Sequence, residues 1–199
     1  FENIPGVSVR YIRHPKDLGS PDMILLPGTK NTMDDLLWMR QCGLEAAILK
    51  EAAKGKIIFG VCGGYQMLGE TLSDPFHVEA GGEIRGMGLL PMETVFTKEK
   101  TRTRVEGNFR SLGGPLEKLS RVLVEGYEIH MGETRRKEGA FEAVEITDGV
   151  TGEQKIDGTW KENVYGTYIH GVFGRQEVVK AVLVAIAEKQ GIDVPATGA

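Results

Sequence analysis

The stretch KIIFGVCGGYQMLG, residues 56–69, decides the fold of this chain. Its first half, residues 56–61, is almost entirely apolar, which is typical of a strand buried on both faces. Its second half spaces apolar residues as a helix does, and the glycines between the two halves favour a tight turn. The stretch therefore predicts a strand, a sharp turn that carries Cys62, and a helix.

Strand and helix patterns also alternate on the N-terminal side of this stretch. The run from Val7 to Ile12 alternates and is β-branched, which predicts a strand, and residues 23–26 predict a second, fully buried strand. A helix is expected from residue 31 or 32 to about residue 54, interrupted at Gly43 and ended by Gly55. This alternation predicts an α/β fold, with a mostly parallel, doubly wound sheet covered by helices on both faces.

The middle of the chain, residues 81–146, has a different composition. It is rich in Gly, Thr, Val and Glu, and its short alternating runs predict strands that are partly antiparallel; these runs are 92–96, 121–125 and 143–146. After it, we expect a strand over 164–169, a closing helix over 177–190 and a frayed tail over 193–199. All 199 residues are expected to form a single domain.

Composition and charge exclude several classes of function. The net charge is −4 and no basic block is present, so no nucleic-acid partner is expected. No apolar stretch reaches the roughly 20 residues that cross a bilayer, so no membrane partner is expected either. The two cysteines, Cys42 and Cys62, lie in different predicted elements and do not suggest a disulfide framework. The cytoplasm is therefore the expected compartment.

Cys62 sits in the pattern of a nucleophile elbow, Gly-x-Cys-x-Gly, between the predicted strand and helix. A sharp turn strains the backbone of the nucleophile, so its neighbours must be small. We expect the helix N-terminus to lower the pKa of the thiol, and the N–H of Gly63 to be free to stabilise an oxyanion. The alternative for a lone cysteine is a small buried core residue, which is the interpretation that we keep for Cys42.

A cysteine nucleophile needs a base, and His170 is the candidate. It directly follows the predicted strand 164–169, so it emerges at the carboxyl edge of the sheet. Cys62 emerges at the same edge, which is where the active sites of α/β folds open. The alternative is that a histidine at the end of a strand merely caps a loop.

Four stretches of the chain occur together in one order: LPGTKNT (26–32), GVCGGYQMLG (60–69), GYEIHMG (126–132) and YIHGVF (168–173). Together they resemble class I glutamine amidotransferase domains, and more narrowly the C-terminal half of cobyric acid synthases. The resemblance runs from about residue 7 to residue 190. It implies a flavodoxin-like fold and a glutaminase that acts by a Cys–His mechanism.

The resemblance implies roles for individual residues. Cys62 would attack the side-chain amide of L-glutamine, and His170 would protonate the departing ammonia and then activate the hydrolytic water. The backbone N–H groups of Gly28 and Gly63 would hold the oxyanion. No metal takes part in this chemistry.

Two further residues match positions that contact glutamine in the family, Gln66 and His130. The alternatives are that Gln66 is a solvated helix residue and that the segment around His130 is a plain turn between strands. One position departs from the family pattern, because Val172 stands where most members carry a glutamate that orients the catalytic histidine. Another group must fix the tautomer of His170, and we expect Glu128, another carboxylate or a backbone carbonyl to do so.

The same resemblance implies that this chain is the glutaminase half of a larger synthetase. The missing N-terminal half would bind ATP and Mg²⁺ and hold the corrinoid substrate, and no phosphate-loop motif occurs in these 199 residues. This domain itself needs no cofactor. The ammonia would amidate side-chain carboxylates of adenosylcobyrinic acid a,c-diamide, giving cobyric acid in cobalamin biosynthesis.

Three alternatives stay open from the sequence. The same glutaminase chemistry could serve another acceptor, as in a cobyrinate a,c-diamide synthase or a lipid II amidating pair. A different enzyme class could use a similar elbow, such as an intracellular cysteine peptidase. The chain could also be a non-catalytic regulatory domain, an alternative that the valine at position 172 keeps open.

Overall fold

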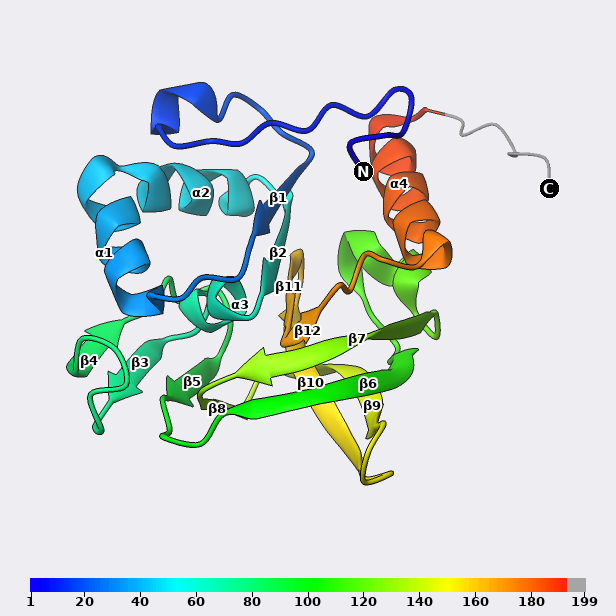
Figure 1. Ribbon diagram of the computed structural model, residues 1–199. Coiled ribbons are helices and arrows are strands. Elements are labelled where there is room, and N and C mark those ends of the chain that lie inside the picture. Colours follow the sequence, from blue (N-terminus) through cyan, green and yellow to red (C-terminus); the bar gives the residue numbers. More distant parts are fainter. Residues whose placement is uncertain (193–199) are drawn as a thin grey trace.

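The computed structural model describes residues 1–192, and Figure 1 shows the arrangement of its helices and strands. In chain order the elements are η1 (Pro15–Asp17), β1 (Met23–Leu26), α1 (Thr32–Cys42), α2 (Leu44–Ala53), β2 (Ile57–Val61), α3 (Gly63–Met67), β3 (Thr71–Asp74), β4 (Gly82–Arg85), β5 (Met92–Val95), β6 (Thr101–Phe109), η2 (Gly114–Leu119), β7 (Leu123–His130), β8 (Glu133–Arg136), β9 (Phe141–Asp148), β10 (Gln154–Lys161), β11 (Val164–Thr167), β12 (Ile169–His170) and α4 (Gln176–Gln190).

The larger sheet contains eight strands in the order β1-β2-β11-β10-β9-β6-β7-β12. Strands β1, β2 and β11 run parallel, and every pair from β11 to β12 is antiparallel. The predicted α/β class is confirmed, but the prediction of a mostly parallel sheet is wrong. The reason is that β9, β10 and β11 follow one another through short turns, which join antiparallel neighbours, whereas parallel neighbours need a long crossover.

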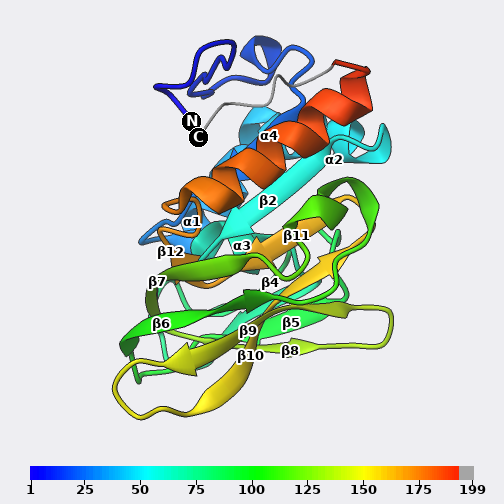
Figure 2. The same cartoon turned by 90° about the vertical axis from the view of Figure 1, so that its right-hand side faces the viewer.

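Helices cover both faces of the parallel strands. Side chains alternate along β2, so that Ile58 packs into one core with residues of α1 and α2, while Ile57 and Phe59 pack into a second core with η2 and α4. Figure 1 shows α1 and α2 on one side of β1 and β2 and α4 on the other, and in Figure 2 α4 runs alongside β2. The apolar run of residues 57–61 is therefore buried on both faces, as predicted.

A second, smaller sheet has four strands in the order β4-β3-β5-β8. It packs on the same core as α1 and α2 through residues such as Leu72 and Met92. Together with β6, β7 and β9, these strands confirm that residues 81–146 are mostly strands with antiparallel pairing.

The predicted strand over residues 7–12 is wrong. This segment crosses the top of the molecule in Figure 1 and pairs with none of the described strands. Ile12 packs against the core around α1 and α2, but Tyr11 is 85% exposed, so the segment is held at the surface without strand pairing. Instead the guanidinium of Arg10 donates hydrogen bonds to the carbonyl oxygens of Asp17 and Leu18, which hold the segment against η1.

The predicted helices are confirmed. α1 and α2 are separated at Gly43, whose φ of 86° lies in the left-handed region, and α4 matches the expected closing helix. Within residues 1–192, no helix combines the length and apolarity that a bilayer span requires, and no cluster of three metal-ligating side chains is arranged to hold an ion. The predicted frayed tail, 193–199, lies outside the described residues.

Candidate active site

The three parallel strands end at one edge of the sheet. Leu26 at the end of β1 is paired with Gly60, and Val61 at the end of β2 is paired with Thr167. The residues that follow these strands therefore meet in space. They include Gly28 after β1, Cys62 after β2 and His170 after β11.

Cys62 occupies a strained turn between β2 and α3. Its φ of 52° and ψ of −114° are rare for a residue with a side chain. A Cβ atom at Gly64 would lie 2.1 Å from the carbonyl oxygen of Leu26, and one at Gly60 would lie 2.7 Å from that of Gly64. α3 can approach β1 and β2 this closely because both positions are glycine. The strand, turn and helix predicted for residues 56–69 are confirmed.

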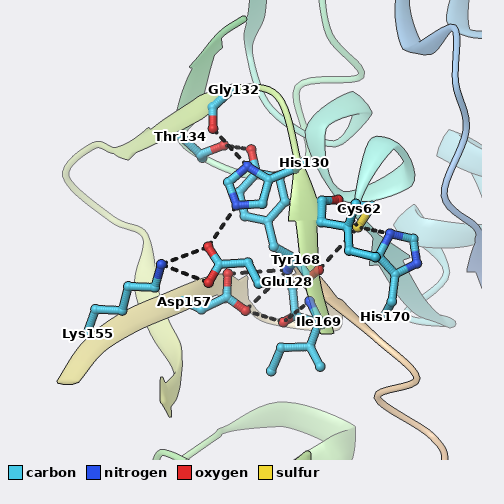
Figure 3. Close-up of polar contacts among 12 residues, drawn as sticks. Cys62, Glu128, His130, Gly132, Thr134, Lys155, Asp157, Tyr168, Ile169 and His170 are labelled. Atoms are coloured by element: carbon cyan, nitrogen blue, oxygen red, sulfur yellow. Dashed lines mark hydrogen bonds and ion pairs between the residues drawn. The ribbon is translucent and has the colours of Figure 1, made fainter. Parts of the chain in front are cut away.

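The sulfur of Cys62 faces the imidazole of His170, as Figure 3 shows. Its Sγ lies 2.8 Å from Nε2 of His170, 3.2 Å from the carbonyl oxygen of Tyr168 and 3.5 Å from that of Ile129. Cys62 is only 4% exposed. The structure thus brings the two side chains singled out by the sequence to hydrogen-bonding distance.

The environment of Cys62 favours the thiol over the thiolate. Burial, and after it the carboxylates of Asp157 and Glu128, raise the pKa of the Cys62 thiol to about 12. The predicted lowering of this pKa by a helix N-terminus is therefore wrong. α3 has only five residues, and its field does not offset burial beside two carboxylates. At neutral pH the sulfur keeps its proton, within reach of His170.

The two predicted oxyanion residues lie beside Cys62. A Cβ atom at Gly28 would lie 3.5 Å from Cβ of Cys62 and 3.1 Å from Cε1 of His170. Gly63 is the first residue of α3, where a main-chain N–H has no carbonyl partner within the helix. A role of these two glycines in binding an oxyanion stays a prediction.

Gln66 is a buried polar residue. It is 3% exposed, so the alternative of a solvated helix residue is wrong. Its Nε2 donates a hydrogen bond to the hydroxyl of Tyr168 at 3.2 Å, and its Oε1 accepts one from the hydroxyl of Thr32 at 3.4 Å. These contacts fix an amide side chain one turn beyond Cys62.

His130 is held by three neighbours at the end of β7 (Figure 3). Its Nδ1 lies 2.9 Å from the carbonyl oxygen of Gly132, its Nε2 lies 2.7 Å from Oε1 of Glu128, and its ring stacks on Tyr168 with centroids 3.7 Å apart. Both ring nitrogens face acceptors, so both contacts are hydrogen bonds only when the ring carries two protons as imidazolium. A contact between His130 and glutamine stays a prediction.

The structure does not support the expectation that Glu128 orients His170. The carboxylate of Glu128 binds His130 instead, together with Nζ of Lys155 at 2.7 and 2.9 Å. The pairing of β12 with β7 places Glu128 opposite Ile169 and His170 opposite Tyr127. Since successive residues of a strand point to opposite faces, Glu128 and His170 point away from each other.

The two ion-pair partners also set the charge of Glu128. Burial acts to raise the pKa of the Glu128 carboxyl, but hydrogen bonds from His130 and Lys155 outweigh it. The net result is a pKa below the usual range, so this carboxylate is ionised at neutral pH.

The sequence analysis missed Asp157, a buried residue of β10. Figure 3 shows its carboxylate directed at the backbone of Tyr168, whose N–H lies 3.2 Å from each carboxylate oxygen; the hydroxyl of Thr167 donates a further hydrogen bond. Burial, and then the charge of Glu128, raise the pKa of Asp157 to about 6. In the sequence, the pair Asp157-Gly158 is typical of a hairpin turn. The pattern therefore gives no sign that this carboxylate lies in the interior of a strand.

Comparisons with known proteins point to one family. The profile of the CobB/CobQ-like glutamine amidotransferase domain matches residues 1–178. The chain is similar to cobyric acid synthases from Ruminiclostridium cellulolyticum (52% identity over 195 residues, 97% of this chain and 38% of that protein) and Lachnoclostridium phytofermentans (46% over 201 residues, 97% and 39%). It therefore spans less than two fifths of the length of these relatives.

A solved structure described as a glutamine amidotransferase shares the fold of this chain. The TM-score is 0.61 at 15% sequence identity, with 94% of this chain and 88% of the other chain covered. This likeness confirms the predicted fold class.

Proposed function

We propose, since this chain belongs to the family of CobB/CobQ-like glutamine amidotransferase domains, that it hydrolyses L-glutamine with Cys62 as the nucleophile and His170 as the acid–base catalyst. The observation that carries the proposal is the 2.8 Å contact between Sγ of Cys62 and Nε2 of His170 at the elbow. A non-catalytic domain would gain nothing from a strained turn that holds a cysteine at hydrogen-bonding distance from a histidine.

The first half of the reaction releases ammonia. As Sγ attacks the amide carbon of glutamine, the thiol proton moves to Nε2 of His170. The negative charge that develops on the amide oxygen is stabilised by the N–H groups of Gly28 and Gly63. The carbon–nitrogen bond then breaks while His170 returns its proton to the leaving nitrogen, which gives ammonia and a glutamyl thioester on Cys62.

The second half regenerates the thiol. His170 removes a proton from a water molecule as the water oxygen attacks the thioester carbon. The carbon–sulfur bond breaks, the sulfur takes back a proton from His170, and glutamate leaves. Because the thiol is protonated in the resting protein, Cys62 is activated only when its proton can move to His170 during attack.

The pocket for glutamine is formed, in this proposal, by the residues around Sγ. Gln66 offers a buried amide that is held in place by Thr32 and Tyr168. The segment that carries His130 borders the same space, because the carbonyl oxygen of Ile129 lies 3.5 Å from Sγ. Amide and carbonyl groups of this kind can recognise the amino-acid end of glutamine.

The acceptor of the ammonia is proposed from the relatives. Two proteins at 52% and 46% identity are named cobyric acid synthases, which supports amidation of corrinoid side-chain carboxylates by a longer protein. In that protein an N-terminal domain would bind ATP and Mg²⁺ and hold the corrinoid, while this chain needs no cofactor of its own. A cytoplasmic location fits its two free cysteines.

Replacement of Cys62 tests the proposed function. In the longer protein, Cys62→Ala should abolish amidation with glutamine, while ATP-dependent amidation with an ammonium salt persists. The matched control, Cys42→Ser, should retain both activities. Normal use of glutamine by the Cys62→Ala variant would contradict the proposal.

Covalent labelling gives a second test that needs no acceptor. The glutamine analogue diazo-oxo-norleucine should add to Cys62 and not to Cys42, as peptide mass mapping would show. Labelling confined to Cys42 would contradict the assignment of the nucleophile.

A further inference from the structure

The backbone changes sheet partner immediately before His170. β11 pairs in parallel with β2 as far as Thr167, and β12 pairs in an antiparallel manner with β7 from Ile169 onward. Tyr168 forms the break between the two strands. The position of the His170 imidazole therefore depends on how this break is held.

Side chains of β10 and β11 bind the backbone at this break. The carboxylate of Asp157 accepts the N–H of Tyr168, at 3.2 Å from each oxygen, and also the hydroxyl of Thr167. The hydroxyl of Thr167 in turn accepts the N–H of Ile169 at 3.1 Å. The main-chain N–H groups of two consecutive residues are thus fixed by one carboxylate and one hydroxyl.

The segment fixed in this way contacts Cys62 through three of its residues. The carbonyl oxygen of Thr167 accepts the N–H of Cys62 at 2.9 Å, the carbonyl oxygen of Tyr168 lies 3.2 Å from Sγ, and His170 places Nε2 at 2.8 Å from Sγ. A shift of the break would therefore move all three contacts together.

We propose that Asp157, acting through Thr167 and the backbone of Tyr168, is a positioning residue that sets the distance between Cys62 and His170. This inference rests on the proposed glutaminase function. It assigns to a carboxylate of a different strand the task of placing the histidine, which the valine at position 172 cannot perform.

A stabilising role alone does not account for a carboxylate at this position. Folding raises the pKa of Asp157 from 3.8 to about 6. The protonated form therefore contributes stability that is fully present below pH 3.8 and is lost as the pH rises through about 6. At neutral pH the ionised side chain of Asp157 lowers the stability of the fold. Such a cost is expected of a residue that is kept for function, here because its carboxylate accepts the hydrogen bonds that hold the active site.

Asp157 also acts on Cys62 through its charge, whereas Thr167 does not. The Asp157 carboxylate is the largest cause after burial of the raised pKa of the Cys62 thiol. The titratable groups that interact with Asp157 come from the elbow, α3, β7 and the break itself: Cys62, Tyr65, Glu128, His130 and Tyr168. Substitutions at Asp157 and Thr167 therefore separate a change of position from a change of charge.

Three substitutions of nearly unchanged size test the inference. Asp157→Asn and Thr167→Val should each lower kcat for glutamine hydrolysis about 10- to 100-fold with little change in KM, because the misplaced histidine affects the transition state. Thr167→Ser keeps the hydroxyl and should retain activity close to that of the unmodified protein. Two different positions are used so that, if one variant fails to fold, the variant at the other position still tests the inference.

The rate of Cys62 alkylation by iodoacetamide against pH gives the second readout. Asp157→Asn should shift this profile to lower pH, whereas Thr167→Val should leave it within about 0.3 pH units of the unmodified protein, since no charge changes. The Asp157→Asn shift follows from the lost charge alone, so Thr167→Val isolates the change of position: a role that is only structural would leave its kcat unchanged.

The outcomes separate the inference from the proposed function. If the unmodified protein hydrolyses glutamine and both the Asp157→Asn and Thr167→Val variants do so equally well, the inference is overturned and the proposed function stands. If the unmodified protein does not hydrolyse glutamine, the proposed function itself is wrong.

Discussion

The two sides of the active site are built in different ways. On the side of the parallel strands, Gly28, Cys62 and Gly63 follow directly from the ends of β1 and β2, so short segments place them. On the side of the antiparallel strands, Glu128 lies within β7 and Asp157 within β10. The pairing register of these strands directs both side chains toward the site. The comparison teaches that a local turn places the nucleophile, whereas strands distant in sequence set its electrostatic surroundings and hold the backbone that leads to His170.

The two carboxylates of the antiparallel side differ as well. Glu128 accepts hydrogen bonds from His130 and from the ammonium group of Lys155, which hold its pKa below the usual range. Among residues 1–192, the partners of the Asp157 carboxylate are the neutral hydroxyl of Thr167 and the backbone N–H of Tyr168, and burial raises its pKa to about 6. Burial is common to both, so the charge of the partners decides the sign of the shift.

The largest expected effect concerns the parallel side. His170→Ala should reduce glutamine hydrolysis about 1,000-fold, because acid–base catalysis of this kind contributes two to four orders of magnitude. The control is His14→Ala, an exposed histidine in a loop, which should retain the activity. Steady-state kinetics check both variants, and a His170→Ala variant with normal kcat would show that the reacting pair has been misidentified.

The next effect concerns the close packing of the elbow. Gly64→Ala should destabilise the fold by about 3 kcal/mol, because the added methyl group meets the carbonyl oxygen of Leu26. The control is Gly152→Ala, at a φ of 72° with nothing within 4 Å of the new Cβ, which carries only the backbone cost of about 1 kcal/mol. Urea denaturation measures both losses. If the two variants lost the same stability, the close approach of α3 to β1 would not be what requires a glycine at position 64.

The same comparison explains how much of the site could be predicted from the sequence. The elbow around Cys62 and the position of His170 follow from signals within a few residues, namely an apolar strand, glycines at a turn and a histidine at a strand end. These features depend on local chain geometry and on the common edge of parallel strands.

Features that depend on tertiary pairing could not be predicted in the same way. The partner of Glu128 depends on the register of β7 against β12, and a one-residue difference reverses the face to which a side chain points. The run from Val7 to Ile12 has the pattern of a strand but no neighbouring strand to pair with. The raised pKa of Cys62 comes from burial and, after it, from two carboxylates that are remote in sequence.

A smaller effect is expected on the antiparallel side. Glu128→Gln should destabilise the fold by about 2 kcal/mol at pH 7, because charge-assisted hydrogen bonds to His130 and Lys155 are lost. The folded-state pKa of Glu128 lies below its usual 4.5, so its contribution is present above pH 4.5 and is lost as the pH falls through the folded-state value. Urea denaturation at pH 7 and at lower pH should show the difference narrowing. The exposed control Glu106→Gln should show neither effect.

The smallest effect separates the two partners of Glu128. The side chain of Lys155 is 37% exposed, so water and salt screen its ion pair, and Lys155→Met should cost only about 0.5 kcal/mol. This loss should shrink further in 0.5 M salt, as ionic screening requires. Lys118→Met, which removes a more exposed pair with Glu188, is the control and should cost nothing measurable. If Lys155→Met instead destabilised the protein as much as Glu128→Gln does, the lysine rather than buried His130 would be the group that keeps Glu128 ionised.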